Sequence, residues 1–292
     1  MEIFFTLVVK LIPLYVFIIL GVLSGKFLKV DKEGLAKIAF YVITPEIIFT
    51  GILKTKLSLS LLSLPFVIFA LSLVVLLITY GVARLWWRDS SRNILAFCGS
   101  VGNVGYFGLP VAMMLFDEQT LGAYILSLQG VIFFQTSVGF YICAKGRYSS
   151  WDSIKKVLYL PTLYAFILGV ACNIFRIPLP TILLDVDMYA RASYTVFGMM
   201  IMGISLTTIS RKNFDAPFVG VAMVMKMLLW PALTLFFITC DTLFMGIYTP
   251  EVYKTLMLIA ISPVAVNSVV IATLVDVYPE KAAAAVLIST AC

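Results

Sequence analysis

Two segments of the chain place polar and helix-breaking residues in the middle of long apolar runs. The first is GNVGYFGLPV, residues 102–111, and the second is ISPVAVNS, residues 261–268. A helix interrupted in lipid exposes backbone groups that must be satisfied by protein or water. Such an interruption is tolerated where it lines a cavity, in which free amides bind an anion and free carbonyls bind a cation. The candidate substrate-binding residues are therefore Asn103, Gly105, Pro110, Ser262, Pro263, Asn267 and Ser268.

Three ionisable residues also fall within apolar runs, where an unpaired charge is expensive and is therefore a functional candidate. Glu46 follows Pro45 well inside the second run and is the candidate ion-coupling group, as the carrier of a proton. The alternatives are a static ion pair between Glu46 and Lys10, or a Lys10 side chain that extends outward to the interface. Lys226, near the middle of the eighth run, is a further candidate for attracting an anion or pairing with Glu46.

The composition indicates that these residues lie in a membrane protein. Of the 292 residues, 62% are hydrophobic and 12% are charged, against roughly 45–50% and about 25% in soluble domains. The net charge is +6, but the basic residues stand singly or in pairs between apolar runs, where they indicate topology rather than nucleic-acid binding. The chain has no histidine and its five cysteines lack CxxC spacing, so we expect neither a metal nor another cofactor.

Apolar runs of about 20 residues, each long enough to cross a bilayer core of about 30 Å, follow one another along the chain. The first has no basic segment before it and is too long for a signal peptide, so we expect it to be retained. The last is too short to cross alone, so either the natural chain continues past Cys292 or this run is tilted or incomplete. The runs predict ten membrane spans, at residues 3–28, 34–53, 62–86, 93–116, 120–143, 157–175, 189–209, 216–239, 253–275 and 280–292.

The two halves of the chain resemble each other. The segment PLYVFIILGV (13–22) matches PTLYAFILGV (161–170), PFV (65–67) matches PFV (217–219), and FDEQTLGA (116–123) parallels YPEKAAAA (278–285). These matches predict two five-helix repeats, residues 1–143 and 157–292, joined by a cytoplasmic loop, 144–156. An odd number of spans inverts the second repeat. Both interruptions then fall in the fourth span of a repeat, which favours a binding site over the alternative of close packing by small residues.

The distribution of Lys and Arg predicts the orientation in the membrane. With the N-terminus outside, 14 of these residues lie on the cytoplasmic side, and those outside are Lys54, Lys56, Arg176, Arg191 and Lys254. Because Lys and Arg bias loops to the cytoplasm, we expect both termini to lie outside. The sequence therefore predicts a multi-pass protein of the plasma membrane, which is the inner membrane in a bacterium.

At these residues the chain resembles the auxin efflux carrier family of membrane transporters. The resemblance covers essentially the whole chain and is carried by the five-plus-five organisation, by GNVGYFGLPV and by ISPVAVNSVVIA (261–272). It implies that spans four and nine cross at their interruptions, and that the bundle divides into a scaffold unit and a transport unit. It also implies organic-anion substrates, such as auxin or small dicarboxylates. The compact middle loop is similar to that of bacterial members.

We therefore expect an all-α secondary transporter, such as a symporter, that moves a small organic anion by alternating access, coupled to protons or sodium. A channel or a non-transporting sensor built on the same fold is the alternative. An enzyme is not expected, because the chain has neither a GxSxG nor an HExxH motif. The expected partners are the organic anion, the coupling ion and membrane lipid, with a homodimer as one alternative and no nucleic acid.

Overall fold

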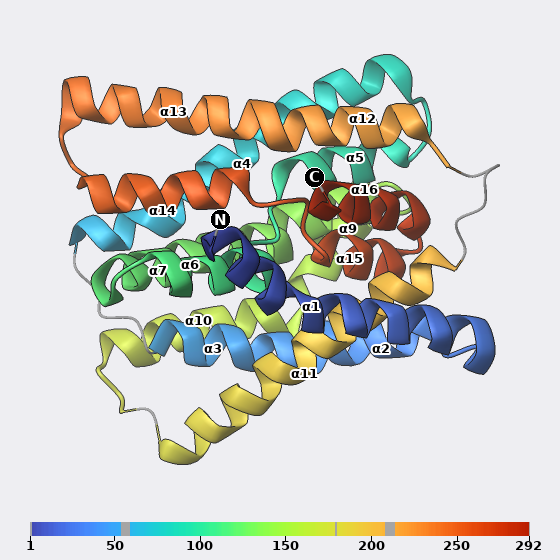
Figure 1. The fold of residues 1–292 in the computed structure, drawn as a ribbon, viewed down its shortest axis with the longest axis horizontal. Helices are drawn as coiled ribbons and strands as arrows, with labels where there is room; N and C mark the ends of the chain where they lie inside the picture. Colours follow the sequence, from blue (N-terminus) through green and yellow to red (C-terminus); the bar gives the residue numbers. More distant parts are fainter. Residues whose placement is uncertain (1, 54–58, 179, 208–213, 292) are drawn as a thin grey trace.

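The computed structural model describes residues 2–53, 59–178, 180–207 and 214–291, and the regular elements among them are helices (Figure 1). The helices up to the middle loop are α1 (Glu2–Leu23), α2 (Lys32–Ile38), α3 (Thr44–Leu53), α4 (Leu59–Trp86), α5 (Ser91–Ser100), α6 (Leu109–Leu115), α7 (Glu118–Phe134) and α8 (Phe140–Lys145). The remaining helices are α9 (Ser150–Leu158), α10 (Pro161–Ile174), α11 (Thr181–Leu206), α12 (Ala216–Val224), α13 (Trp230–Cys240), α14 (Pro250–Ile261), α15 (Asn267–Val275) and α16 (Pro279–Ala291).

Short π-helical turns extend several of these helices or join them into longer rods. They are η1 (Ser24–Leu28), η2 (Ala39–Ile43), η3 (Val104–Gly108), η4 (Gln135–Gly139), η5 (Met225–Leu229) and η6 (Asp241–Met245). Among the described residues, the helices long and apolar enough to cross a membrane are Lys32–Leu53, Leu61–Trp86, Thr120–Lys145 and Ala216–Met245. The bent pair α9 and α10 adds a fifth if it forms one span. The all-helical membrane architecture is thus confirmed, and the number of ten spans stays a prediction.

Helices α1, α2, α3, α10 and α11 lie together and are called here the α11 group (Figure 1). Within it, α1 packs along α11 and α3 packs along α10. Two glycines bring the first pair into backbone contact. A Cβ atom on Gly203 would lie 2.1 Å from the carbonyl oxygen of Ile18, and one on Gly21 would lie 2.4 Å from that of Met200. Because no side chain fits at these distances, the sequence needs glycine at both positions.

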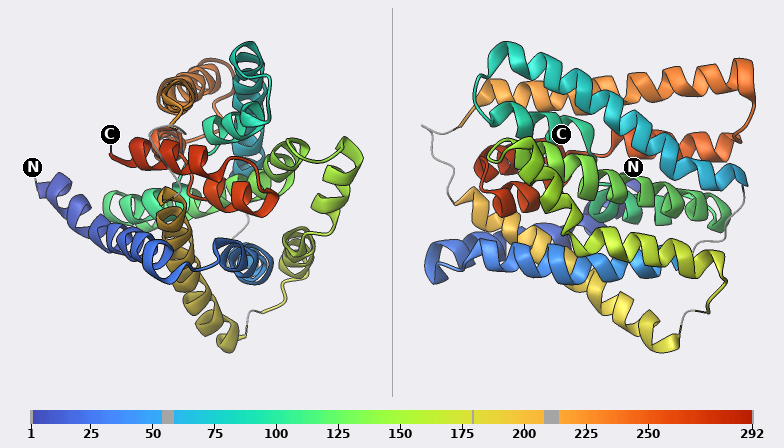
Figure 2. Two further views of the ribbon diagram at one scale, coloured as in Figure 1. Left: turned by 90° about the vertical axis from the view of Figure 1, so that its right-hand side faces the viewer. Right: turned by 180° about the vertical axis from the view of Figure 1, so that it is seen from behind.

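Helices α4 to α8 and α12 to α16 are called here the crossing group, and α9, which packs against α8, belongs to neither group. Figure 2 shows α15 and α16, in red, between the rod formed by α12 and α13 and the helices of the α11 group. The buried run Ala282–Ala285 lies on α16, which packs against α12 and α15. Small side chains let these helices approach closely, so that α15 is held at the centre of the molecule.

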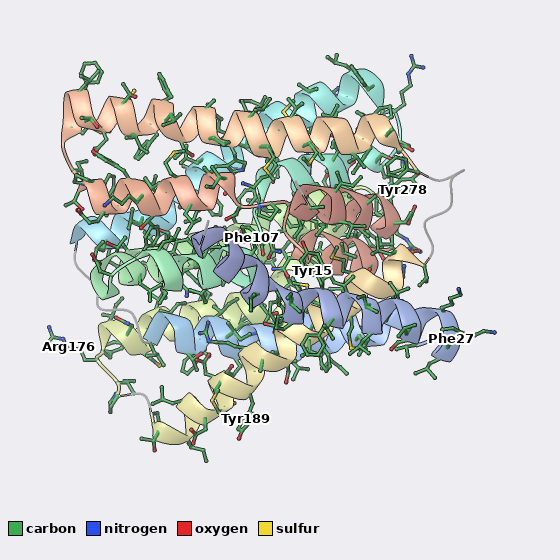
Figure 3. All side chains as sticks on the ribbon, viewed as in Figure 1. Tyr15, Phe27, Phe107, Arg176, Tyr189 and Tyr278 are labelled. Carbon is green, nitrogen blue, oxygen red and sulfur yellow. The ribbon has the colours of Figure 1, made fainter. Side chains whose placement is uncertain are left out.

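Large apolar side chains cover much of the outer surface. Phe27, Phe66, Tyr189 and Phe244 are exposed, and Figure 3 shows Phe27 and Tyr189 at the margin of the molecule. Exposed apolar surface on this scale is unfavourable in water and is expected for a surface that faces lipid. The arrangement agrees with a protein embedded in a membrane.

Two segments differ from the sequence-based expectation. Helix α11 begins at Thr181 rather than at residue 189, so Asp187 lies within the helix, where it pairs with Arg191 one turn later at 2.7 Å. The topology count assigned Arg191 to the outer side, and the structure places it inside α11 and in the lining of a cavity. The loop predicted at 144–156 contains most of α9, whose first turn is capped by Ser149, since its Oγ accepts from the amide of Asp152 at 3.1 Å.

Candidate functional site

The two interrupted segments cross each other and pair through their backbones. Helix α5 ends at Ser100 and α14 ends at Ile261, and the chain beyond each end is extended. Gly102 and Val264 form an antiparallel bridge. The amide of Asn103 donates to the carbonyl of Pro263 at 2.6 Å. Each interruption therefore satisfies backbone groups that the other leaves free, and this pairing is called here the crossing.

Side chains satisfy further backbone groups at the crossing. The amide of Val264 donates to the Oγ of Ser289 on α16 at 3.0 Å. The hydroxyl of Tyr124 on α7 donates to the carbonyl of Val104 at 2.8 Å. Because Pro263 has no amide hydrogen, it adds no donor that would need a partner. The crossing is thus a buried, hydrogen-bonded junction that holds the ends of four half-helices in place.

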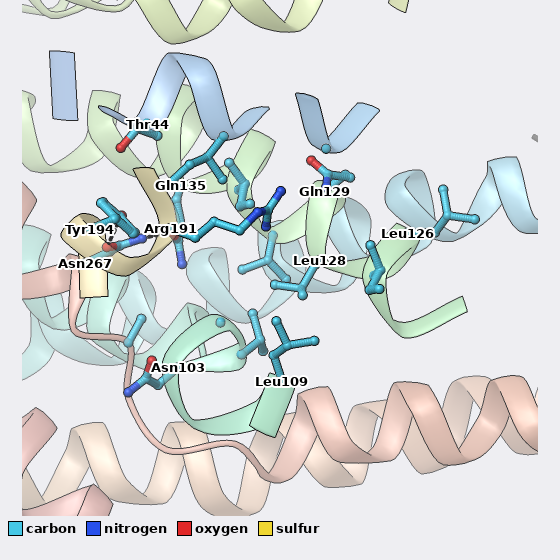
Figure 4. Close-up of a pocket in the computed structure, with 18 of the residues that line it drawn as sticks. Thr44, Asn103, Leu109, Leu126, Leu128, Gln129, Gln135, Arg191, Tyr194 and Asn267 are labelled. Atoms are coloured by element: carbon cyan, nitrogen blue, oxygen red, sulfur yellow. Dashed lines mark hydrogen bonds between the residues drawn. The ribbon is translucent and has the colours of Figure 1, made fainter. Parts of the chain in front are cut away.

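A cavity of about 1170 Å³ lies between the α11 group and the crossing (Figure 4). Its walls come from α3, α7, η4 and α11 and from the residues on either side of the crossing. Most of the wall is apolar, with leucine, isoleucine and valine side chains. The polar residues that line it are Thr44, Asn103, Gln129, Gln135, Thr136, Asp187, Arg191, Tyr194, Thr195 and Asn267.

Arg191 supplies the positive charge of this cavity, because it is the only Lys or Arg among the described residues that line it. Its Nε donates to Oδ1 of Asp187 at 2.7 Å, and the same oxygen accepts from the hydroxyl of Thr50 at 2.8 Å. The Asp187 carboxylate is buried, whereas 41% of the Arg191 side chain is exposed. Figure 4 shows this side chain reaching between Gln135 and Gln129. The guanidinium therefore faces the space that a ligand would occupy.

Asn267 joins the crossing to both walls of the cavity. Its Nδ2 donates to Oε1 of Gln135 at 2.6 Å, and its Oδ1 accepts from the hydroxyl of Tyr194 at 2.5 Å. Gln135 belongs to the crossing group and Tyr194 to the α11 group. The Asn267 side chain is therefore held by one partner from each group at the first residue of α15.

The structure brings three of the predicted site residues together in the cavity wall, namely Asn103, Gly105 and Asn267. The other described candidates do not line it. Ser262 and Ser268 are buried, and the Ser262 hydroxyl donates to the carbonyl of Leu258 at 2.7 Å. Pro263 lies within the crossing, and the side chain of Pro110, on α6, falls outside the described part of the chain. Substrate binding by any of these residues stays a prediction.

Of the three charges predicted within the membrane, the structure describes the side chains of Glu46 and Lys226. Glu46 is on α3, with both carboxylate oxygens buried, between the cavity-lining residues Thr44 and Ile47 but not itself lining the cavity. The side chain of Lys10 falls outside the described residues, so an ion pair with Glu46 is not tested. Lys226 is buried in η5, donates to backbone carbonyls and does not line the cavity. The structure thus gives no support to direct attraction of an anion by Lys226.

The polar residues that α7, η4 and α11 contribute to the cavity were not predicted from the sequence. Gln129 and Gln135 lie in one apolar run, where each polar amide needs a partner. Asp187 and Arg191 stand four residues apart, which is the spacing of a salt bridge on a helix. These two patterns in the sequence could have identified Gln129, Gln135, Asp187 and Arg191 as residues that face the interior of the bundle rather than lipid. Among the described residues, no group of His, Cys, Asp or Glu is placed to hold a metal ion.

The fold and the site define a helical membrane protein in which a polar cavity adjoins two crossed helix interruptions. A profile of the membrane transport protein family matches residues 6–154, which is more than half of the chain. The chain belongs to this family, the auxin efflux carriers that its interrupted segments resemble.

Relatives named as transporters match nearly the full length of the chain. It is 28% identical to an uncharacterized transporter of Methanocaldococcus jannaschii, over 94% of this chain and 92% of that protein. It is also 24% identical to a "putative malonate transporter" of Rhizobium meliloti, over 96% of this chain and 90% of that protein. The family and these relatives identify the protein as a membrane transporter.

Proposed function

We propose that the protein is a secondary active transporter that carries a small organic anion across the plasma membrane by alternating access. The observation that carries this proposal is the position of Arg191, whose guanidinium faces the cavity beside the crossing. A guanidinium presents several N–H donors in a plane and binds carboxylates through two parallel hydrogen bonds. The apolar part of the cavity wall suits the carbon skeleton of an organic acid.

The arrangement of the helices supports an inverted repeat of ten spans. In the predicted repeat, α1 corresponds to α10 and α3 corresponds to α11. The pair α1 with α11 then corresponds to the pair α10 with α3, and both pairs are packed together in the α11 group. The crossing likewise joins the two corresponding interruptions. Movement of one group against the other, with the cavity between them, is the motion that we propose for alternating access.

A carboxylate is the substrate class that we propose, with malonate as the first compound to test. The relative from Rhizobium meliloti is named for malonate, and Arg191 with the amides of Gln129, Gln135, Asn103 and Asn267 offers donors to such an anion. The proposed site is therefore the cavity rather than the crossing alone.

Proton coupling through Glu46 is the mode of energy coupling that we propose. Its carboxylate is buried on the helix that forms one wall of the cavity, and a buried carboxylate near a substrate site can bind and release a proton as the site opens to each side. Proton and substrate binding are then coupled through α3.

The test is counterflow in liposomes that contain the purified protein. Liposomes loaded with unlabelled malonate are expected to accumulate labelled malonate transiently, with a rate that saturates. A panel of mono- and dicarboxylates added in competition defines the substrate class. Uptake that does not saturate and shows no counterflow would indicate a channel, and the absence of any carboxylate flux or binding would overturn the proposal.

A further inference from the structure

Lys226 is fully buried, and its ammonium group lies against backbone carbonyls. Its Nζ donates to the carbonyl of Ala260 at 2.6 Å and to that of Ile259 at 3.3 Å. The ammonium also stands 5.0 Å from the centre of the Trp230 ring, at a distance typical of a cation–π contact. Among the described residues, no carboxylate lies within salt-bridge distance of Lys226. Its described contacts are therefore carbonyls and a ring, which are the contacts of a bound cation.

The two carbonyls belong to the end of α14, immediately before the crossing. The last four carbonyls of a helix have no partner within the helix and carry a partial negative charge. At this end, the carbonyl of Leu258 accepts from Ser262, while those of Ile259 and Ala260 accept from Lys226. In interrupted membrane helices, such carbonyl ends are the groups that coordinate a sodium ion. In this chain the ammonium of Lys226 stands at that place.

Lys226 also contacts the other interrupted segment. A Cβ atom on Gly102 would lie 3.0 Å from Cε of Lys226 and 3.2 Å from the carbonyl oxygen of Ile259. Gly102 precedes Asn103, whose side chain lines the cavity, and bridges to Val264. One turn further along, the indole of Trp230 donates to the carbonyl of Ser100 at 2.9 Å, at the end of α5. The rod from α12 to α13 thus fixes the carbonyl ends of both interrupted helices.

We propose that Lys226 is a resident cation of the crossing: its ammonium takes the place of a bound sodium ion and positions Gly102 and Asn103 beside the cavity. When Lys226 is protonated, its ammonium repels a metal ion from these carbonyls, because two positive charges at one buried place repel each other strongly. Transport therefore needs no sodium at the crossing, and Lys226 acts as a positioning residue without touching the substrate. This inference rests on the proposed transport function and specifies how the crossing is held during it.

The first test compares cations on the wild-type protein. Uptake of labelled malonate and the melting temperature are measured in sodium, potassium and choline chloride at equal ionic strength. Both quantities are expected to be the same in the three salts. A rise of either in sodium over choline would show a dissociable sodium ion and overturn the proposal. If no carboxylate is taken up in any salt, the proposed function fails, while the melting temperatures still test the role of Lys226.

The second test removes the ammonium. Lys226→Met keeps an unbranched side chain about as long as lysine up to Cε and removes the ammonium, and it is expected to lower the melting temperature and to reduce malonate uptake by about tenfold or more. Lys254→Met, at an exposed position on α14, is the matched control and is expected to leave both unchanged. Equal behaviour of the two variants would overturn the proposal.

A third test distinguishes a cation that donates N–H bonds from positive charge alone. Lys226→Ala removes three carbons and the nitrogen, and n-propylammonium restores the same atoms. This ion is expected to raise the melting temperature of Lys226→Ala and leave that of the wild type unchanged. Tetramethylammonium, which carries the charge without an N–H donor, is expected to have no effect. A Lys226→Ala protein that does not respond to n-propylammonium would contradict the proposal.

Discussion

The hydroxyl of Tyr194 donates to Oδ1 of Asn267 at 2.5 Å, and this hydrogen bond runs between the two groups of helices that enclose the cavity. Tyr194 lies on α11 and Asn267 is the first residue of α15, directly beyond the crossing. Because Asn267 also donates to Gln135, its amide is fixed from both sides. If the α11 group moves against the crossing group, either the hydrogen bond between Tyr194 and Asn267 breaks or the Asn267 side chain moves together with Tyr194.

Removal of the Tyr194 hydroxyl is the first prediction. Tyr194→Phe keeps the ring and leaves Oδ1 of Asn267 without this donor. The loss of one neutral hydrogen bond is worth roughly 0.5–1.5 kcal/mol, so we expect malonate affinity or uptake to change by up to about tenfold. Titration of binding and initial uptake rates measure the effect. Tyr189→Phe, at an exposed position on the same helix, is the control, and an equal effect of both variants would contradict a special role for Tyr194.

The second prediction concerns the charge of Arg191. Arg191→Gln removes the guanidinium fork and is expected to weaken carboxylate binding by roughly 10- to 150-fold, the equivalent of about 1.5–3 kcal/mol for a charged hydrogen bond. Arg191→Lys keeps the charge but not the planar fork, so an intermediate loss is expected. Arg176→Gln, on the exposed loop before α11, is the control. Wild-type affinity of Arg191→Gln for every carboxylate tested would move the site elsewhere.

The third prediction separates the two asparagines of the crossing. The described hydrogen bonds of Asn103 run through its backbone, to Pro263, Phe107 and Gly108. Asn103→Ala is therefore expected to weaken substrate binding with little change in melting temperature. Asn267→Ala removes two side-chain hydrogen bonds and is expected to lower both affinity and melting temperature. If both variants bind and transport carboxylates as the wild type does, the crossing serves packing alone.

The sequence predicted the interruptions but not the residues that complete the cavity. Glycine, proline and asparagine close together inside an apolar run are typical of an interrupted helix, so residues 102–111 and 261–268 were recognisable. Arg191 was not, because a charged residue near the start of an apolar run resembles a loop residue. Its partner Asp187 stands four residues earlier, but only the structure shows that this carboxylate also accepts from Thr50 and that both residues line the cavity wall or adjoin it within the bundle.

Lys226 shows a second limit of the sequence. From the sequence, Lys226 was a candidate for attracting an anion or for pairing with Glu46. Its partners in the structure are the backbone carbonyls of Ile259 and Ala260. Every residue has a backbone carbonyl, so the residue types do not show which carbonyls are free to accept a hydrogen bond. The carbonyls of Ile259 and Ala260 are free because α14 ends just beyond them.

The fourth prediction concerns proton coupling. Glu46→Gln keeps the size of the side chain but cannot release a proton. We expect it to abolish malonate uptake driven by a pH gradient while exchange of internal for external malonate continues. Both are measured in the same liposomes, with Glu33→Gln, on the exposed first turn of α2, as the control. Uptake by Glu46→Gln with the pH dependence of the wild type would make Glu46 a structural residue.

The fifth prediction concerns the orientation in the membrane. Basic residues gather in the middle segment, 144–156, where α9 carries Lys155, Lys156 and the exposed Trp151. Because Lys and Arg are retained on the cytoplasmic side, Ser149→Cys in a variant without the native cysteines is expected to resist an impermeant thiol reagent applied to intact cells. It should react after the membrane is opened.

Thr249→Cys, in the exposed turn between η6 and α14, provides the opposite control, since it lies at the other end of the rod that begins at Ala216. It is expected to react in intact cells. Exchange of the two labelling patterns would place both termini in the cytoplasm, and the cavity would then have to be assigned to the opposite membrane face. The positions of Arg191 and the crossing within the protein would not change, so the binding predictions are independent of this outcome.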